Sequence, residues 1–112
     1  MNSSYSISDD IFNISLKLED LSDVSFGTTM LENINKTKLS KVICDLSNID
    51  VIQSKDIKNI EMLIKLFHFN NITTIVCGIN AYSSAIIFHF LDDFDFKTAL
   101  NIQRAINDFK NM

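Results

Sequence analysis

The chain has 112 residues, of which 46% are hydrophobic and 21% are charged, and it contains no proline, two glycines and two cysteines. This composition predicts one well-packed domain over residues 1–112 and excludes disordered, collagen-like and disulfide-stapled classes of protein. Fourteen acidic residues against ten basic ones give a net charge of −4, which argues against a nucleic-acid partner.

The sequence carries no signal for export or for membrane insertion. Its first residues lack the positive charge and apolar stretch of a signal peptide, and no apolar run reaches the ~18 residues that a membrane span needs. We therefore expect a cytoplasmic protein with no membrane partner. Cys44 and Cys77 each lie inside an apolar run, so we expect two buried, inert thiols ahead of a disulfide or a metal site.

The N-terminal third is expected to hold an antiparallel hairpin and a helix. Apolar and polar residues alternate over 5–8 and 11–18, on either side of a tight turn at Asp9–Asp10. Ser22–Asp23 is predicted to cap a helix that runs to about residue 35. The apolar residues of this helix recur at helical spacing: Val24, Met30, Leu31 and Ile34.

The central part alternates strand and helix. The apolar runs 42–46 and 72–77 predict two strands that are buried on both faces. Between them a helix is expected to begin at Ser54. Its apolar residues repeat at steps of three and four, which predicts one buried face: Ile57, Ile60, Leu63, Ile64 and Phe67.

The C-terminal third is expected to hold two helices separated by an edge strand. After Gly78, a cap at Ser83 or Ser84 is predicted to begin a short apolar helix. Residues 92–97 are predicted to form a turn and a short edge strand. Thr98 is then expected to cap the last helix, whose inner stripe is Ala99, Ile102, Ala105, Ile106 and Phe109.

The predicted order of elements is ββαβαβαβα. Alternation of strands and helices is typical of a mostly parallel sheet with right-handed crossovers, here preceded by an antiparallel hairpin. The fold class expected from the sequence is therefore a small α/β sandwich.

Few residues are suited to catalysis or metal binding. His68 and His89 lie far apart, each between phenylalanines, and neither has the spacing of a metal ligand. Two glycines cannot form a phosphate loop or a dinucleotide fingerprint. Asp45 and Asp50 have no accompanying base or nucleophile, so we expect them to cap a loop, and the acidic turn 92–95 lacks a calcium-loop pattern. We expect a protein that is not an enzyme and holds no cofactor or metal.

Three segments resemble those of a known family. A buried strand leads through Asp45–Ser47 to a serine, Ser54, at the start of the next helix. Val76–Asn80 ends a strand in a Gly-Ile turn before a short helix, and Thr98–Asn101 opens the last helix. In this order the segments resemble the STAS domain of anti-sigma-factor antagonists, and in particular the RsbS-like scaffold protein of bacterial stressosomes. The resemblance covers nearly the whole chain in element order.

The resemblance implies a STAS-like sandwich with a regulatory role. In this family the serine that matches Ser54 is phosphorylated by a serine/threonine kinase of the anti-sigma type, which also binds the unmodified domain. RsbS-like members assemble with paralogous STAS sensor proteins, so a homo- or hetero-oligomer in stress-response or sigma-factor signalling is expected. The partner-binding residues are expected around the serine and the Gly-Ile turn: Asn48, Gln53, Lys55, Lys58, Glu61, Gly78, Ile79, Asn80 and Tyr82.

The chain departs from the family pattern beside the acceptor serine. Gln53 stands where relatives usually carry aspartate, and Lys55 stands where a small or apolar residue often follows. A plain helix N-cap is the structural alternative for Ser54, worth about 1 kcal/mol. Two other functions stay open: a STAS module that binds a nucleotide or lipid beneath the Gly78–Ile79 turn, and an assembly subunit that is never modified.

Overall fold

The computed structural model describes residues 5–90 and 97–112, whose strands form one sheet in the order β1-β2-β3-β4-β5. β1 pairs antiparallel with β2, and each later pair of neighbours is parallel. The mostly parallel sheet with an N-terminal antiparallel hairpin is thus confirmed. The strands are β1 (Tyr5–Ser8), β2 (Ile11–Ser15), β3 (Lys41–Asp45), β4 (Thr73–Cys77) and β5 (Lys97–Ala99).

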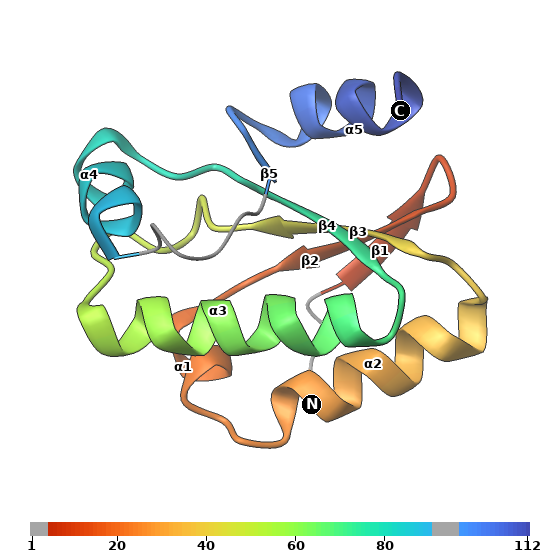
Figure 1. The fold of residues 1–112 in the computed structure, drawn as a ribbon, viewed down its shortest axis with the longest axis horizontal. Helices are drawn as coiled ribbons and strands as arrows, with labels where there is room; N and C mark the ends of the chain where they lie inside the picture. The colour runs from red at the N-terminus through yellow and green to blue at the C-terminus, as the bar shows by residue number, and fades with distance from the viewer. Residues whose placement is uncertain (1–4, 91–96) are drawn as a thin grey trace.

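Helices cover both faces of this sheet. They are α1 (Leu18–Leu21), α2 (Phe26–Thr37), α3 (Ser54–Phe69), α4 (Ala81–Phe90) and α5 (Ile102–Lys110). Figure 1 shows α1, α2 and α3 on one face, α5 on the other, and α4 beside the start of α3. Among the described helices, none is long and apolar enough to span a membrane.

The core divides into two clusters because successive residues of a strand face opposite sides of the sheet. On β3, Val42 and Cys44 point into the larger cluster beneath α2 and α3, whereas Ile43 points into the smaller cluster beneath α5. All three side chains are fully buried, as expected for a strand covered on both faces. Cys44 and Cys77 are buried free thiols, which confirms that prediction.

The predicted turn at Asp9–Asp10 closes the hairpin. Both residues have positive φ, 54° and 62°, and the flanking residues Ser8 and Ile11 face each other across the two strands. A two-residue loop with positive φ at both positions is the type I′ turn, whose twist matches that of the strands it joins. The turn therefore fixes the register of β1 on β2.

The segment between β2 and α2 differs from the prediction. A short helix, α1, occupies residues 18–21, where only the end of a strand was expected. α2 begins at Phe26, because Asp23 accepts hydrogen bonds from the backbone N–H and the hydroxyl of Ser25 and so holds a turn before the helix. Val24, which was expected among the apolar residues of this helix, lies before α2 and is fully exposed.

The caps predicted for the last two helices were also wrong. α4 begins at Ala81, because the side chain of Asn80, and not Ser83 or Ser84, accepts the backbone N–H of Ser83. Thr98 lies within β5, opposite Val76, and not at a helix start.

α5 begins only at Ile102, after Asn101, whose side chain accepts the N–H of Arg104. Ala99, which was expected on the inner stripe of this helix, lies in β5 instead. Ile102 is 38% exposed, whereas Ala105, Ile106 and Phe109 are buried as expected. The turn predicted over 92–96 lies outside the described residues.

Candidate functional site

The candidate site lies at the edge of the sheet where β3 and β4 end. From β3 the chain enters a loop, residues 46–53, that leads to the start of α3. Leu46, Ile49 and Ile52 are each at most 3% exposed and belong to the larger core cluster. These three side chains anchor every third residue of the loop in the core. The intervening loop residues and the start of α3 are therefore held in place.

A second loop, which follows β4, is fixed against the first. The N–H of Leu46 donates to the carbonyl oxygen of Cys77 at 2.8 Å. Gly78 has a φ of +76°, and a Cβ atom at this position would lie 2.5 Å from Oδ1 of Asp45 and 2.9 Å from the backbone N of Ser47. Only glycine accommodates both the conformation and the close approach. The same contact places Asp45 and Ser47 directly against the Gly78 turn. This is the place where the alternative function, binding of a nucleotide or lipid, would need a pocket.

Three polar side chains complete these connections. Asn80 Nδ2 donates to the carbonyl oxygen of Asp50 at 2.8 Å, which joins the two loops. Asn48 Nδ2 donates to the hydroxyl of Ser15 at 2.8 Å, which joins the first loop to the end of β2. Asp45 Oδ1 accepts the N–H of Ser47 at 3.0 Å, which confirms the loop-capping role expected for this carboxylate.

Ser54 is the first residue of α3, and its side chain is exposed. The helix is capped by Gln53, so the alternative of Ser54 as the N-cap is wrong. The backbone N–H of Gln53 donates to Oδ2 of Asp56 at 2.9 Å, and the carbonyl of Gln53 accepts the N–H groups of Asp56 and Ile57. Asp56 is only 7% exposed, so the start of α3 is firmly held.

The hydroxyl of Ser54 makes no hydrogen bond to any other described residue. It lies at a helix N-terminus, where backbone N–H groups lack helical partners and the helix dipole is positive. This environment favours a negative group. The site can therefore accept a phosphoryl group on Ser54 without breaking a hydrogen bond of the unmodified protein.

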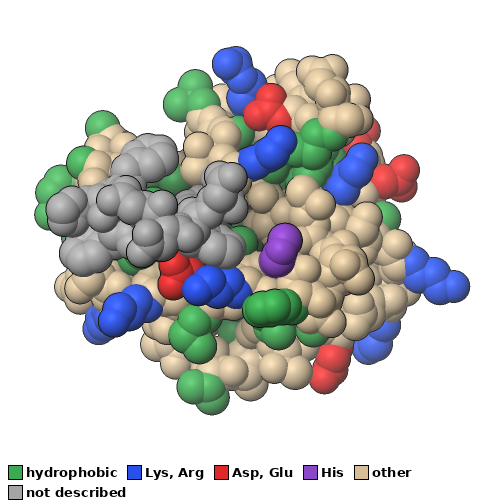
Figure 2. Space-filling model, viewed as in Figure 1, with side chains coloured by type: hydrophobic (Ala, Val, Ile, Leu, Met, Phe, Trp, Pro, Cys, Tyr) green, Lys and Arg blue, Asp and Glu red, His purple; other side chains and the backbone are tan. Residues whose placement is uncertain are grey.

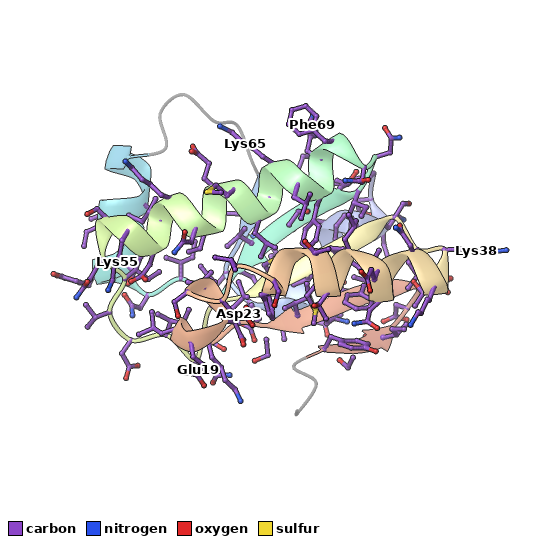
Figure 3. The ribbon with its side chains drawn as sticks, turned by 90° about the horizontal axis from the view of Figure 1, so that it is seen from below. Glu19, Asp23, Lys38, Lys55, Lys65 and Phe69 are labelled. Carbon is purple, nitrogen blue, oxygen red and sulfur yellow. The ribbon has the colours of Figure 1, made fainter. Side chains whose placement is uncertain are left out.

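Several expected partner-binding residues lie around Ser54. Lys55 and Lys58 are exposed on α3, and Figure 3 shows Lys55 pointing away from the helix at its first turn. Tyr82, on the first turn of α4, is 64% exposed. Glu61 lies one turn beyond Lys58 and pairs with Lys65 at 3.6 Å. Their role in binding a partner stays a prediction.

The remaining expected partner-binding residues have structural contacts at the same edge. Gly78 and Ile79 are partly buried, and Ile79 packs against the larger core cluster. Asn48 and Asn80 are exposed, although their amide groups are occupied by the loop contacts described above. We infer that these four residues shape the surface more than they offer free groups to a partner.

The described residues offer no metal site, because no three or more His, Cys, Asp and Glu side chains gather among them. His68 is exposed near the end of α3, far along the helix from Ser54. His89 lies on α4, but its side chain is outside the described part, as is the acidic turn expected over 92–95.

Two contacts that hold the site together were not found from the sequence, although Gln53 and Asn48 themselves were expected at the site. The spacing of Gln53 and Asp56 is that of a capping box, in which the fourth residue reaches back to the cap, so this pair had a detectable signal. The hydrogen bond between Asn48 and Ser15 joins residues 33 positions apart. No local sequence pattern predicts a contact between residues so far apart.

Comparison with known proteins places this geometry on a known fold. No family model matches the chain, and no curated protein sequence matches it. Among solved structures, a serine-to-glutamate variant of RsbS from Moorella thermoacetica matches with a TM-score of 0.84 over 96% of both chains, at 20% identity. This chain has the fold of RsbS.

Two further structures share the RsbS fold. A chain from a structure of the stressosome matches with a TM-score of 0.83 over 96% of both chains, at 22% identity. The stressosome is described there as a signal integration and transduction hub. The NMR structure of TM1081 matches with a TM-score of 0.82, covering all of this chain and 91% of that one at 16% identity. TM1081 comes from Thermotoga maritima, where it is described as a candidate anti-sigma factor antagonist. The predicted STAS-like fold is thereby confirmed.

Proposed function

We propose that this chain is a non-catalytic regulatory and scaffold protein of the RsbS type, controlled by phosphorylation of Ser54. Its kinase partner would be a serine/threonine kinase of the anti-sigma type, and its assembly partners would be paralogous STAS sensor proteins in the cytoplasm. One observation carries the proposal: in a chain with the RsbS fold, an exposed serine hydroxyl stands at the start of α3 on a loop anchored in the core.

The switch needs no change of fold. A phosphoryl group on Ser54 adds about two negative charges at a helix start, a position that tolerates them. Docked against a partner, one pair of like charges ~5 Å apart at an effective dielectric constant of ~20 costs roughly 3 kcal/mol. Since 1.4 kcal/mol is about a tenfold change in affinity, one modification can weaken binding on the order of a hundredfold.

The alternative of a nucleotide or lipid pocket beneath the Gly78–Ile79 turn has less support. A side-chain atom at Gly78 would already lie within 3.0 Å of Asp45 and Ser47, so these residues occupy the space under the turn. The regulatory proposal, by contrast, uses the exposed surface at Ser54 and requires no cavity.

The proposal is tested by incubating the full chain with the purified anti-sigma-type kinase of the same organism, ATP and Mg²⁺, and mapping phosphate by mass spectrometry. We expect one phosphoryl group on the peptide that contains Ser54. The matched control is Ser54→Ala, which should keep its fold and incorporate no phosphate. Phosphate on another serine, or an unmodified wild-type chain in the presence of active kinase, would overturn the assignment and favour the unmodified assembly subunit.

A further inference from the structure

Two exposed apolar side chains lie together close to Ser54. Leu18, the first residue of α1, is 44% exposed, and Val51, in the loop between β3 and α3, is 53% exposed. They are more than thirty residues apart in the chain, yet both of them line the same two surface hollows, as Glu19 does. Leu18 and Val51 therefore form an apolar ridge at which the two hollows meet.

The hollows extend from this ridge in two directions. One has a volume of about 530 Å³ and reaches along the loop to Asn48 and Asp50. The other has a volume of about 370 Å³ and reaches the first turn of α3, where Gln53 and Lys55 line it. Because Gln53 and Lys55 are the chain neighbours of Ser54, the second hollow joins the apolar ridge to the proposed phosphorylation site.

Both halves of the apolar ridge are held in place from below. Val51 is followed by Ile52, whose side chain is 2% exposed and belongs to the larger core cluster. Leu18 begins a helix whose start is held by a hydrogen bond of 3.1 Å from the N–H of Lys17 to Oδ2 of Asp20. A surface that is already ordered loses less conformational entropy when a partner binds, so the ridge is suited to docking.

The area that a kinase must cover decides what would occupy this ridge. A kinase that modifies Ser54 has to bring the Ser54 hydroxyl into its active site, so its contact surface surrounds that residue. A stable protein-protein interface covers about 800 Å² on each partner, which is the area of a disc with a radius of about 16 Å. Val51 is three residues from Ser54, a separation of at most about 11 Å in an extended chain. An interface centred on Ser54 therefore includes Val51.

Charged side chains lie beside the ridge. Glu19 and Lys55 line the hollow that leads to Ser54, and Figure 3 shows them well apart, on α1 and α3 respectively. Figure 2 shows lysine side chains next to hydrophobic ones over the face of the molecule where α3 runs. An apolar centre with a charged, solvent-accessible rim is the usual composition of a protein-protein interface.

We propose that Leu18 and Val51 are the apolar docking point of the kinase that modifies Ser54. The kinase then approaches Ser54 from the side of α1 and covers the ridge with an apolar surface of its own. This inference rests on the proposed function, from which it takes the kinase as partner, and it deepens that function by naming the docking surface. Neither Leu18 nor Val51 is among the partner-binding residues expected from the sequence.

Steady-state phosphorylation of the full chain by the purified anti-sigma-type kinase of the same organism tests the docking point. Val51→Ser and Leu18→Ser should each raise the KM of the kinase for this chain at least about fivefold, because an apolar contact with the kinase is lost. The kcat should stay unchanged, since the Ser54 hydroxyl and the first turn of α3 are untouched. Thermal denaturation checks that both variants are folded, and Val51→Ser, in a loop, decides the outcome if Leu18→Ser is not.

The matched control is Leu100→Ser, at the same edge of the sheet. Leu100 is 76% exposed and follows β5, where its carbonyl oxygen accepts the N–H of Gly78, but it lines neither hollow. Its replacement should change the KM by less than about twofold. An effect of Leu100→Ser equal to that of Leu18→Ser, or an unchanged KM in Val51→Ser, would overturn the docking point. A fall in kcat at unchanged KM in Val51→Ser would overturn it as well.

A binding measurement separates this proposal from the proposed function. Ser54→Ala cannot be phosphorylated at this position, so its complex with the kinase can be measured by isothermal titration calorimetry. Adding Val51→Ser to this variant should raise the dissociation constant at least about fivefold, and an unchanged value would contradict the docking point. If the kinase instead binds through Val51 but leaves Ser54 of the wild-type chain unmodified, the phosphorylation switch fails and the docking point stands.

Discussion

Gly78 is the residue on which the geometry of the site depends most directly. Its positive φ lets the chain turn at the end of β4, and the absence of a side chain lets that turn lie against Asp45 and Ser47. The sequence predicts that a strand ends before this glycine, but the loop that the glycine touches, at Asp45 and Ser47, lies more than thirty residues away in the chain. A single residue thus joins the loop before α3 to the loop before α4.

Replacing Gly78 should be costly. In Gly78→Ala the alanine must adopt a left-handed backbone conformation that L-residues rarely adopt, and its methyl group displaces the Asp45 carboxylate. We therefore expect the free energy of unfolding to fall by about 2 kcal/mol. Urea denaturation measures it. Gly27→Ala is the matched control, because a Cβ at Gly27 meets only flexible leucine side-chain ends, and we expect a change of under about 1 kcal/mol there. Equal losses would show that the Gly78 contact has no special role.

The buried thiols give a pH dependence with a defined sign. Burial, together with the neighbouring Cys77 and Asp45, raises the pKa of Cys44 from 9.0 to about 12. The native state therefore holds this proton more tightly than the unfolded chain does, and stability falls as the pH rises above 9.0 toward 12. Urea titrations across this range should show a smaller fall in Cys44→Ala than in the wild type. Identical pH profiles for the two proteins would contradict the contribution of Cys44 to the loss of stability.

At the scale of elements, the two buried strands and the start of α3 could be predicted, whereas the starts of α2, α4 and α5 could not. The runs 42–46 and 72–77 are apolar on both faces, so burial by helices on each side left a continuous signal that matches β3 and β4. Asn80 caps α4 while its amide group binds the carbonyl of Asp50, a residue of another loop. Thr98 is drawn into β5 by pairing with Val76. In both cases a contact with a residue far away in the sequence decided where the helix begins.

The start of α3 yields a prediction that separates the two roles of its first turn. Asp56 is buried and accepts the N–H of Gln53, so Asp56→Ala should lower the free energy of unfolding by about 1 kcal/mol. Ser54→Ala should change it by less than about 0.5 kcal/mol, because the Ser54 hydroxyl is exposed and caps nothing. Thermal or urea denaturation of both variants checks this. A larger loss in Ser54→Ala than in Asp56→Ala would make Ser54 a structural residue.

For the molecule as a whole, the candidate site is confined to one edge of the sheet. The ends of β3 and β4, the start of α3 and the first turn of α4 meet at that edge, and α5 packs on the opposite face of the sheet from α3. Sequence order and strand burial were enough to place Ser54 at this edge, because the carboxyl ends of parallel strands lie together. The exposure of Val24 was not predicted, since it depends on the turn that Asp23 and Ser25 form before α2.

The proposed regulatory function depends on negative charge at Ser54 releasing a docked kinase. The most direct measurement is the dissociation constant of the kinase for wild type, Ser54→Glu and Ser40→Glu, by isothermal titration calorimetry. Ser40 is also exposed but precedes β3, at the other end of that strand, so it controls for added charge alone. We predict that Ser54→Glu binds on the order of a hundredfold more weakly, as one pair of like charges in an interface implies, while Ser40→Glu binds as the wild type does. Equal affinities for Ser54→Glu and wild type would contradict the account.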